Sequence, residues 1–189
     1  MQELTELFTV ERVHSSPAKF DMKKLEAING DKIRALTIDD FLTRSLPFLK
    51  AANVITGADE EIALVKAALP IIQERITKLN EVPAMLKFLF VENFVVEADS
   101  VAKVSDAASK DVLTRALADL TPLTEWTHTS IEGILRASLI EKLGLKPRIA
   151  FGSVRIAVTG STISPPLFDS MELLGKSACL ERISAAIAL

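Results

Sequence analysis

Aromatic residues, cysteine and glycine are all scarce in this sequence. Aromatic side chains make up 5% of the 189 residues, and there are seven glycines and one cysteine. Alanine, leucine and isoleucine abound instead, so the composition favours helices over a β-sandwich. A lone cysteine forms neither an internal disulfide nor a thiolate metal site, and we expect Cys179 to be a small core residue.

The motifs of common enzymatic chemistry are missing too. The sequence has no phosphate-binding loop, no dinucleotide-binding glycine fingerprint, no zinc-protease His-Glu-x-x-His and no cysteine cluster. His14 and His128 stand far apart among polar neighbours, and we expect both to be plain surface residues rather than metal ligands or bases. We therefore predict no catalytic residue, no metal site and no cofactor within this chain.

Long apolar runs are also absent. No stretch of about 18 apolar residues occurs, as a membrane-spanning helix would require. The first six residues, Met-Gln-Glu-Leu-Thr-Glu, are acidic, which is the reverse of a secretory signal. These features predict a cytoplasmic protein without a membrane partner.

The net charge of −3 argues against a general nucleic-acid coat protein, and against DNA as a partner, because such proteins carry strongly basic surfaces. Its distribution is uneven. Residues 92–132 hold eight acidic against three basic residues, whereas residues 142–168 contain no Asp or Glu but four cations: Lys142, Lys146, Arg148 and Arg155. This stretch is compatible with a local basic face for RNA, or with an ordinary solvated surface.

Apolar periodicity and turn signals predict a series of helices. We expect Pro47 to interrupt the first of them, and Pro70 to break or kink another, after which residues 71–79 continue helically with Arg75 pointing outward. The helices are expected over residues 37–50, 59–69, 71–79, 84–90, 109–120, 129–143, 166–174 and 178–188.

Two later segments carry more specific signals. Thr129 and Glu132 match the S/T-x-x-E pattern of a capping box at a helix start. Residues 150–158 fit both helical spacing and strand alternation. Beyond them, Thr159-Gly-Ser161 is a helix-stop cluster and Ser164-Pro165-Pro166 fixes the backbone twice, which predicts a stiff corner that holds side chains in place.

The sequence around that corner resembles a known pattern. Arg155-Ile-Ala-Val-Thr-Gly160, Ser164-Pro-Pro-Leu-Phe168 and Leu173-Leu-Gly-Lys176 are similar to the C-terminal anticodon-binding region of bacterial glutamyl-tRNA synthetases. A second block, from Phe8 to Gly30, resembles the segment that follows the catalytic half of that family. It departs at Ala27, where many members have tryptophan, and before Ile33, where an aromatic residue is common.

The resemblance implies an all-α fold made of two consecutive multihelical anticodon-binding units. Residues 37–90 would form the first unit and residues 91–189 the second, preceded by the tail of the stem-contact domain in residues 1–36. It also favours a helix over residues 150–158. We expect the chain by itself to be monomeric.

The resemblance further implies the roles of five residues. Arg75 matches the arginine that reads the third anticodon base in discriminating members, where its planar donor fork suits a base. Arg155 matches an arginine that faces the anticodon, and Ser164, Pro165 and Leu167 match positions that pack against or hydrogen-bond its bases. The alternative for Arg75 is a surface helix arginine that pairs with Glu74 or its neighbours.

For the parent protein, the resemblance implies a class I ligase that joins glutamate to its tRNA with ATP and Mg²⁺. The H-I-G-H-like and K-M-S-K-S-like signatures of its catalytic domain are absent here. The chain would therefore bind the anticodon loop of glutamate tRNA without catalysing aminoacylation. A helical protein-interaction module without RNA binding is the alternative, because aromatic stacking platforms are few and the net charge is acidic.

Overall fold

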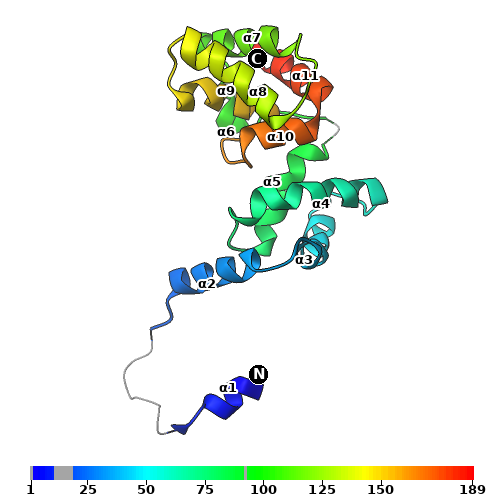
Figure 1. Ribbon diagram of the computed structural model, residues 1–189, viewed down its shortest axis with the longest axis vertical. Coiled ribbons are helices and arrows are strands. Elements are labelled where there is room, and N and C mark those ends of the chain that lie inside the picture. Colours follow the sequence, from blue (N-terminus) through cyan, green and yellow to red (C-terminus); the bar gives the residue numbers. More distant parts are fainter. Residues whose placement is uncertain (1, 11–18, 92) are drawn as a thin grey trace.

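The computed structural model describes residues 2–10, 19–91 and 93–189 of the chain. Every regular element within these ranges is a helix, so the all-α prediction is confirmed. None of the helices in the described ranges is long and apolar enough to cross a membrane. Figure 1 shows two stacked groups of helices that follow α1 (Gln2–Leu7) and α2 (Met22–Arg34).

The lower group, which we call the first unit, consists of two long helices and several short turns. They are α3 (Ile38–Ala51), α4 (Asp59–Gln73), a 3-10 turn (Leu79–Glu81), α5 (Val82–Leu86) and a 3-10 turn (Lys87–Leu89). Its apolar core includes Phe41, Leu49, Val65, Leu69, Ile72, Ile76 and Leu86. Ile33 of α2 also belongs to this core, so α2 packs onto the first unit.

Local signals explain where these two long helices begin. The Thr37 side chain accepts a hydrogen bond from the Asp40 N–H at 3.2 Å and so caps α3, as the sequence predicts. The Glu61 carboxylate accepts the N–H groups of Thr56, Gly57 and Ala58 at 2.8–3.0 Å, which fixes the loop before α4. Those bonds hold the pKa of Glu61 below its ordinary value.

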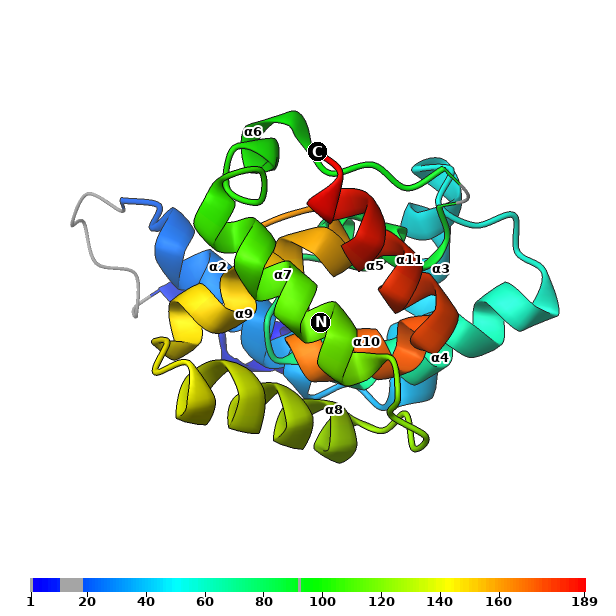
Figure 2. The same ribbon diagram turned by 90° about the horizontal axis from the view of Figure 1, so that it is seen from above.

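The upper group is the second unit. It consists of α6 (Ala98–Val101), α7 (Ala107–Leu120), α8 (His128–Leu135) with a π-helical continuation (Arg136–Lys142), α9 (Pro147–Thr159), α10 (Leu167–Leu174) and α11 (Lys176–Ile187). Figure 2 looks down on it, with α8 on one side of α7 and α11 on the other. Cys179 is fully buried in its core, as expected.

The two prolines do not interrupt their helices. Both α3 and α4 run through their internal proline, Pro47 and Pro70. The predicted continuation over residues 71–79 is wrong, because α4 ends at Gln73 and Arg75 lies in the turn beyond it. The Gln73 amide donates to the carbonyls of Ile33 and Leu36, both at 2.9 Å, so a tertiary contact with the α2–α3 corner holds the end of the helix.

The second unit has the helices expected at α9 and α8, and only the predicted capping box of α8 is wrong. Residues 150–158 are helical, and α9 ends at Gly160, whose φ of 83° is in the left-handed region. The N-cap of α8 is Thr127 rather than Thr129, since its hydroxyl accepts the Ser130 N–H at 3.3 Å. Glu132 pairs with Arg136 at 2.6 Å and forms no capping box.

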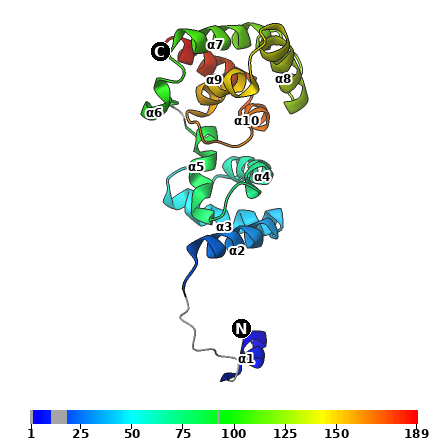
Figure 3. The same ribbon diagram turned by 90° about the vertical axis from the view of Figure 1, so that its left-hand side faces the viewer.

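The two units contact each other directly. Figure 3 shows α5 leading from the first unit towards the second, which sits on top of it. Helix α10 packs against α4, and Leu173 of α10 joins the core of the first unit. Helix α10 therefore packs into the cores of both units.

Candidate nucleic-acid interface

The corner between α9 and α10 holds one guanidinium in place. Arg155 Nη1 donates to Ser164 Oγ at 2.8 Å and to the carbonyl oxygen of Pro165 at 2.7 Å. Behind it, Thr159 Oγ1 donates to the carbonyl of Arg155 at 2.8 Å. The stiff corner predicted from the sequence therefore exists, and it fixes the position of Arg155.

Arg155 is half-buried and pairs with no carboxylate among the described residues. Burial lowers the pKa of its guanidinium, and the nearby positive charge of Arg75 lowers it further. An arginine remains charged despite such shifts. Both of its hydrogen bonds to described residues come from Nη1, which leaves Nε and Nη2 for a ligand.

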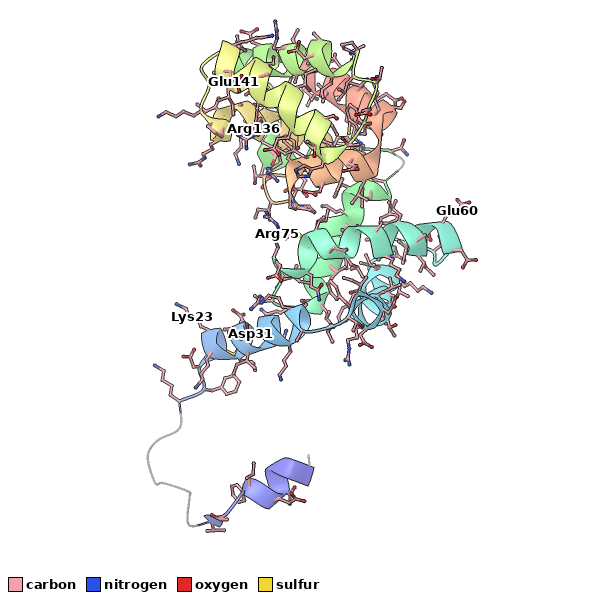
Figure 4. All side chains as sticks on the ribbon, viewed as in Figure 1. Lys23, Asp31, Glu60, Arg75, Arg136 and Glu141 are labelled. Atoms are coloured by element: carbon pink, nitrogen blue, oxygen red, sulfur yellow. The ribbon has the colours of Figure 1, made fainter. Side chains whose placement is uncertain are left out.

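Arg75 approaches Arg155 from the first unit, and Figure 4 shows it at the level where the two units face each other. Its side chain is exposed and forms no ion pair with any described residue. Glu74, the alternative partner from the sequence, instead faces Arg34 at 4.0 Å. Two like charges thus lie close together, an arrangement that favours an anionic ligand.

The other three predicted site residues are buried. Ser164 is 9% exposed, and its hydroxyl is occupied by Arg155 and by the carbonyl of Pro165. Pro165 is buried beside it. Leu167 is 3% exposed and packs into the core of the second unit, so it offers no apolar surface to a base in this structure. The structure therefore unites Arg75, Arg155, Ser164 and Pro165, but not Leu167.

A cleft of about 780 Å³ extends from Arg155 along α9. Three cations line it, Lys103, Arg148 and Arg155, together with the hydroxyls of Ser109, Ser153 and Thr162 and the apolar Ile149, Phe151 and Ile156. The lining includes no Asp or Glu. The acid-free stretch of the sequence thus does form a basic face, although Lys142 and Lys146 do not line the cleft.

Sequence reasoning missed Lys103 and Ser109, because both lie in the stretch counted as acidic. Two serine contacts place them against α9. Ser109 Oγ donates to the carbonyl of Lys103 at 3.0 Å, and Ser153 Oγ donates to Ser109 Oγ at 3.1 Å. No local pattern in the sequence signals this approach of α7 to α9.

A comparison with protein families covers most of the chain. A model described as an anticodon binding domain matches residues 40–187. The chain belongs to this family. The match spans both units, including Arg75 and the corner around Arg155, so the site lies within the anticodon-binding domain.

The relatives of this anticodon-binding domain include many glutamate–tRNA ligases. The ligase of Saccharopolyspora erythraea is 43% identical over 190 residues, which cover 99% of this chain and 38% of the ligase. The ligase of Arthrobacter sp. (strain FB24) is 46% identical over 190 residues, which cover 98% of this chain and 37% of the ligase. The chain therefore spans about 38% of the length of such relatives.

A solved structure supports the fold of the domain. The crystal structure of a glutamate tRNA ligase from Elizabethkingia meningosepticum, in complex with its amino acid, matches with a TM-score of 0.75. The match covers 99% of this chain and 36% of that one at 21% identity. At this identity the likeness supports the helical architecture alone.

A buried arginine joins the two units of the domain. Arg182 of α11 is 9% exposed, and its guanidinium lies 3.9 Å from the ring centroid of Phe94. It donates to the carbonyl of Val158 at 2.8 Å and to that of Phe88 at 2.9 Å. Since Phe88 belongs to the first unit and Val158 to α9, one side chain ties the unit that contains Arg75 to the helix that carries Arg155.

The expectation of a plain surface residue is wrong for His128, while His14 lies outside the described residues. His128 Nδ1 lies 3.0 Å from Asp169 Oδ1, its Nε2 lies 3.2 Å from Glu132 Oε2, and its ring meets Phe168 edge-on. Burial opposes protonation of His128, but the two carboxylates outweigh it and raise its pKa. This histidine therefore links α8 to α10.

Proposed function

We propose that this chain is the anticodon-binding part of a glutamate–tRNA ligase and that it binds glutamate tRNA through the anticodon loop. The relatives at 43–46% identity, which carry that name, support the assignment. The family of the domain supports anticodon binding. In this proposal the chain contributes specificity and affinity, while catalysis belongs to the rest of the ligase.

The observation that carries the proposal is that Arg75 of the first unit lies near Arg155 of the second, while neither arginine forms an ion pair with any described residue. Sequence-specific RNA binding relies on unstacked loop bases, which pack on planar or apolar surfaces and form hydrogen bonds along their edges. A guanidinium supplies both a planar face and a fork of donors. Two such groups near each other suit neighbouring bases of an open loop.

The proposal assigns a different task to each residue. Arg75, exposed and unpaired, reads the third anticodon base. Arg155 contacts a neighbouring base through its free Nε and Nη2 groups. Ser164 and Pro165 accept the hydrogen bonds that aim Arg155, in addition to the base contacts that the family resemblance implies. Leu167 reaches a base only if the corner rearranges when RNA binds.

The parent enzyme is proposed to be a class I aminoacyl-tRNA synthetase that uses ATP and Mg²⁺. Among the described residues, no group of three or more His, Cys, Asp or Glu is arranged to hold a metal ion. We assign the ATP and Mg²⁺ chemistry to the part of the ligase outside this chain, as the family resemblance implies. The chain itself is proposed to act in the cytoplasm as a monomer.

The test measures binding of the chain to glutamate tRNA at low and moderate salt, against the same tRNA with its third anticodon base changed. We expect a preference for the unchanged tRNA, and affinity that falls with salt by a log–log slope of about −0.7 per neutralised phosphate. Replacing Arg75 by glutamine removes about 1–3 kcal/mol of the base preference. Arg44→Gln, an exposed arginine of α3, is the control and leaves the preference intact.

Two outcomes would contradict the proposal. Equal losses for every anticodon variant would show that Arg75 does not read a base. Absence of tRNA binding at low salt, both by this chain and by a full-length ligase that contains it, would favour a protein-interaction module.

A further inference from the structure

We propose that Lys103 and Arg148 form a phosphate-binding site for the RNA backbone beside the anticodon, in the cleft that Arg155 also lines. This inference rests on the proposed function and extends it. It assigns a ligand, a phosphodiester group, to two residues outside the base-reading set. Their contribution is affinity and register rather than choice of base.

The two cations come from separate elements and converge on one cleft. Lys103 follows α6, whereas Arg148 lies in the first turn of α9, and both line the cavity that Arg155 also lines. The exposed hydroxyl of Thr162 in the lining adds a donor for a phosphate oxygen, whereas Ser109 and Ser153 already donate their protons within the protein. A backbone that leaves the bases at Arg155 therefore enters a cleft already supplied with cations.

Six cations elsewhere in the described residues are neutralised by acidic neighbours. Arg34, Lys66, Lys78, Lys87, Arg115 and Arg136 each pair with a carboxylate within 4.0 Å. Lys103 and Arg148 are exposed and form no ion pair with any described residue. Their charges are thus not neutralised locally, which leaves them free to displace counterions from a phosphate.

The neighbouring groups favour RNA backbone over a free anion. Ile149, Phe151 and Ile156 line the same cleft and suit the apolar faces of a sugar and base attached to the phosphate. The cleft is also continuous with Arg155, so one RNA strand reaches both sites. Isolated phosphate would use only part of this lining.

The experiment titrates the chain with glutamate tRNA across a salt series, using Lys103→Gln, Arg148→Gln and the double variant. We expect each substitution to make the log–log slope shallower by about 0.7, and the double variant by about 1.4. Affinities for the native tRNA and for the variant with a changed third anticodon base should fall by the same factor. The control is Arg44→Gln, which leaves both slope and affinity unchanged.

A second measurement tests the contact itself. Neutral methylphosphonate linkages are placed one at a time in the anticodon arm of the tRNA. At one or two positions the unmodified chain should lose affinity, and the double variant should show no further loss at those positions. A non-additive result of this kind is not produced by general destabilisation of the protein.

The outcomes separate this inference from the proposed function. If the chain binds tRNA with a base preference but the double variant retains the full salt slope, the phosphate site is wrong and the anticodon assignment stands. If the losses depend on the third base, Lys103 and Arg148 read bases and the inference is overturned. If the unmodified chain and a full-length ligase that contains it both bind no tRNA, both proposals fall.

Discussion

Ser164 illustrates how one hydroxyl positions a charged group. It accepts from Arg155 Nη1 at 2.8 Å and is itself nearly buried. Replacing Ser164 by alanine should lower the free energy of unfolding by about 1–2 kcal/mol, since a hydrogen bond to a charged group is lost. Urea unfolding of both proteins measures this change in the free energy of unfolding. Ser177→Ala removes an exposed hydroxyl bonded to Glu181 and should change stability by less than about 0.5 kcal/mol. Equal effects would show that Ser164 does not hold Arg155.

His128 should make the stability of the domain depend on pH. Its pKa is raised above the ordinary value of 6.5 by Asp169 and Glu132, against the opposing effect of burial. A raised pKa in the folded state means that the stabilisation is fully present below pH 6.5 and is lost as pH rises through the folded value. His128→Gln should therefore destabilise the protein below pH 6.5 and have progressively less effect at higher pH. The measurement is urea unfolding of the unmodified protein and of His128→Gln at pH values below and above 6.5. A difference in the free energy of unfolding that does not change with pH would contradict the prediction.

At the scale of single elements, the end of α9 depends on Gly160. Its φ is +83°, and a Cβ there would lie 3.2 Å from the Val95 carbonyl oxygen and 3.3 Å from the Phe94 ring. Gly160→Ala should lower the free energy of unfolding by about 1–3 kcal/mol because of this strain. The matched control is Gly133→Ala in α8, where a Cβ would meet no atom within 4 Å. Gly133→Ala should instead raise the free energy of unfolding by about 0.5–1 kcal/mol. Thermal unfolding of both variants shows whether the two substitutions change stability in opposite directions.

The helix ends show which boundaries local sequence signals predict correctly and which they do not. Thr37 and the acidic turn at residues 59–61 predicted the starts of α3 and α4 correctly, because capping and dipole effects act within one helical turn. The end of α4 was predicted wrongly, because Gln73 bonds to carbonyls some forty residues earlier in the chain. Thr127 rather than Thr129 caps α8 since the Glu172 carboxylate, 44 residues away, accepts the His128 N–H. Long-range contacts of this kind leave no periodic signal.

At the scale of the whole molecule, the candidate site was accessible to sequence reasoning only in part. The stiffness of the corner follows from its prolines and glycine, but the approach of Arg75 to Arg155 follows from the packing of α4 against α10. Only the family resemblance connected those two arginines. Arg182 was missed altogether, because nothing near it in the sequence distinguishes a buried arginine from a surface one.

Arg182 supports the last prediction, which concerns how the units are held together. Its guanidinium bonds carbonyls in both units and stacks on Phe94, so Arg182→Met should lower the free energy of unfolding by about 2–4 kcal/mol. Because the arginine pair spans the same junction, the variant should also lose base preference for glutamate tRNA under conditions where it remains folded. Arg182→Lys keeps the charge but lacks the second donor arm. Its free energy of unfolding and its base preference should therefore lie between those of the unmodified protein and those of Arg182→Met. Small-angle scattering of the folded variant would then show a larger radius of gyration. An unchanged radius together with an unchanged base preference would mean that Leu173 and the rest of the α4–α10 contact suffice to align the two units without Arg182.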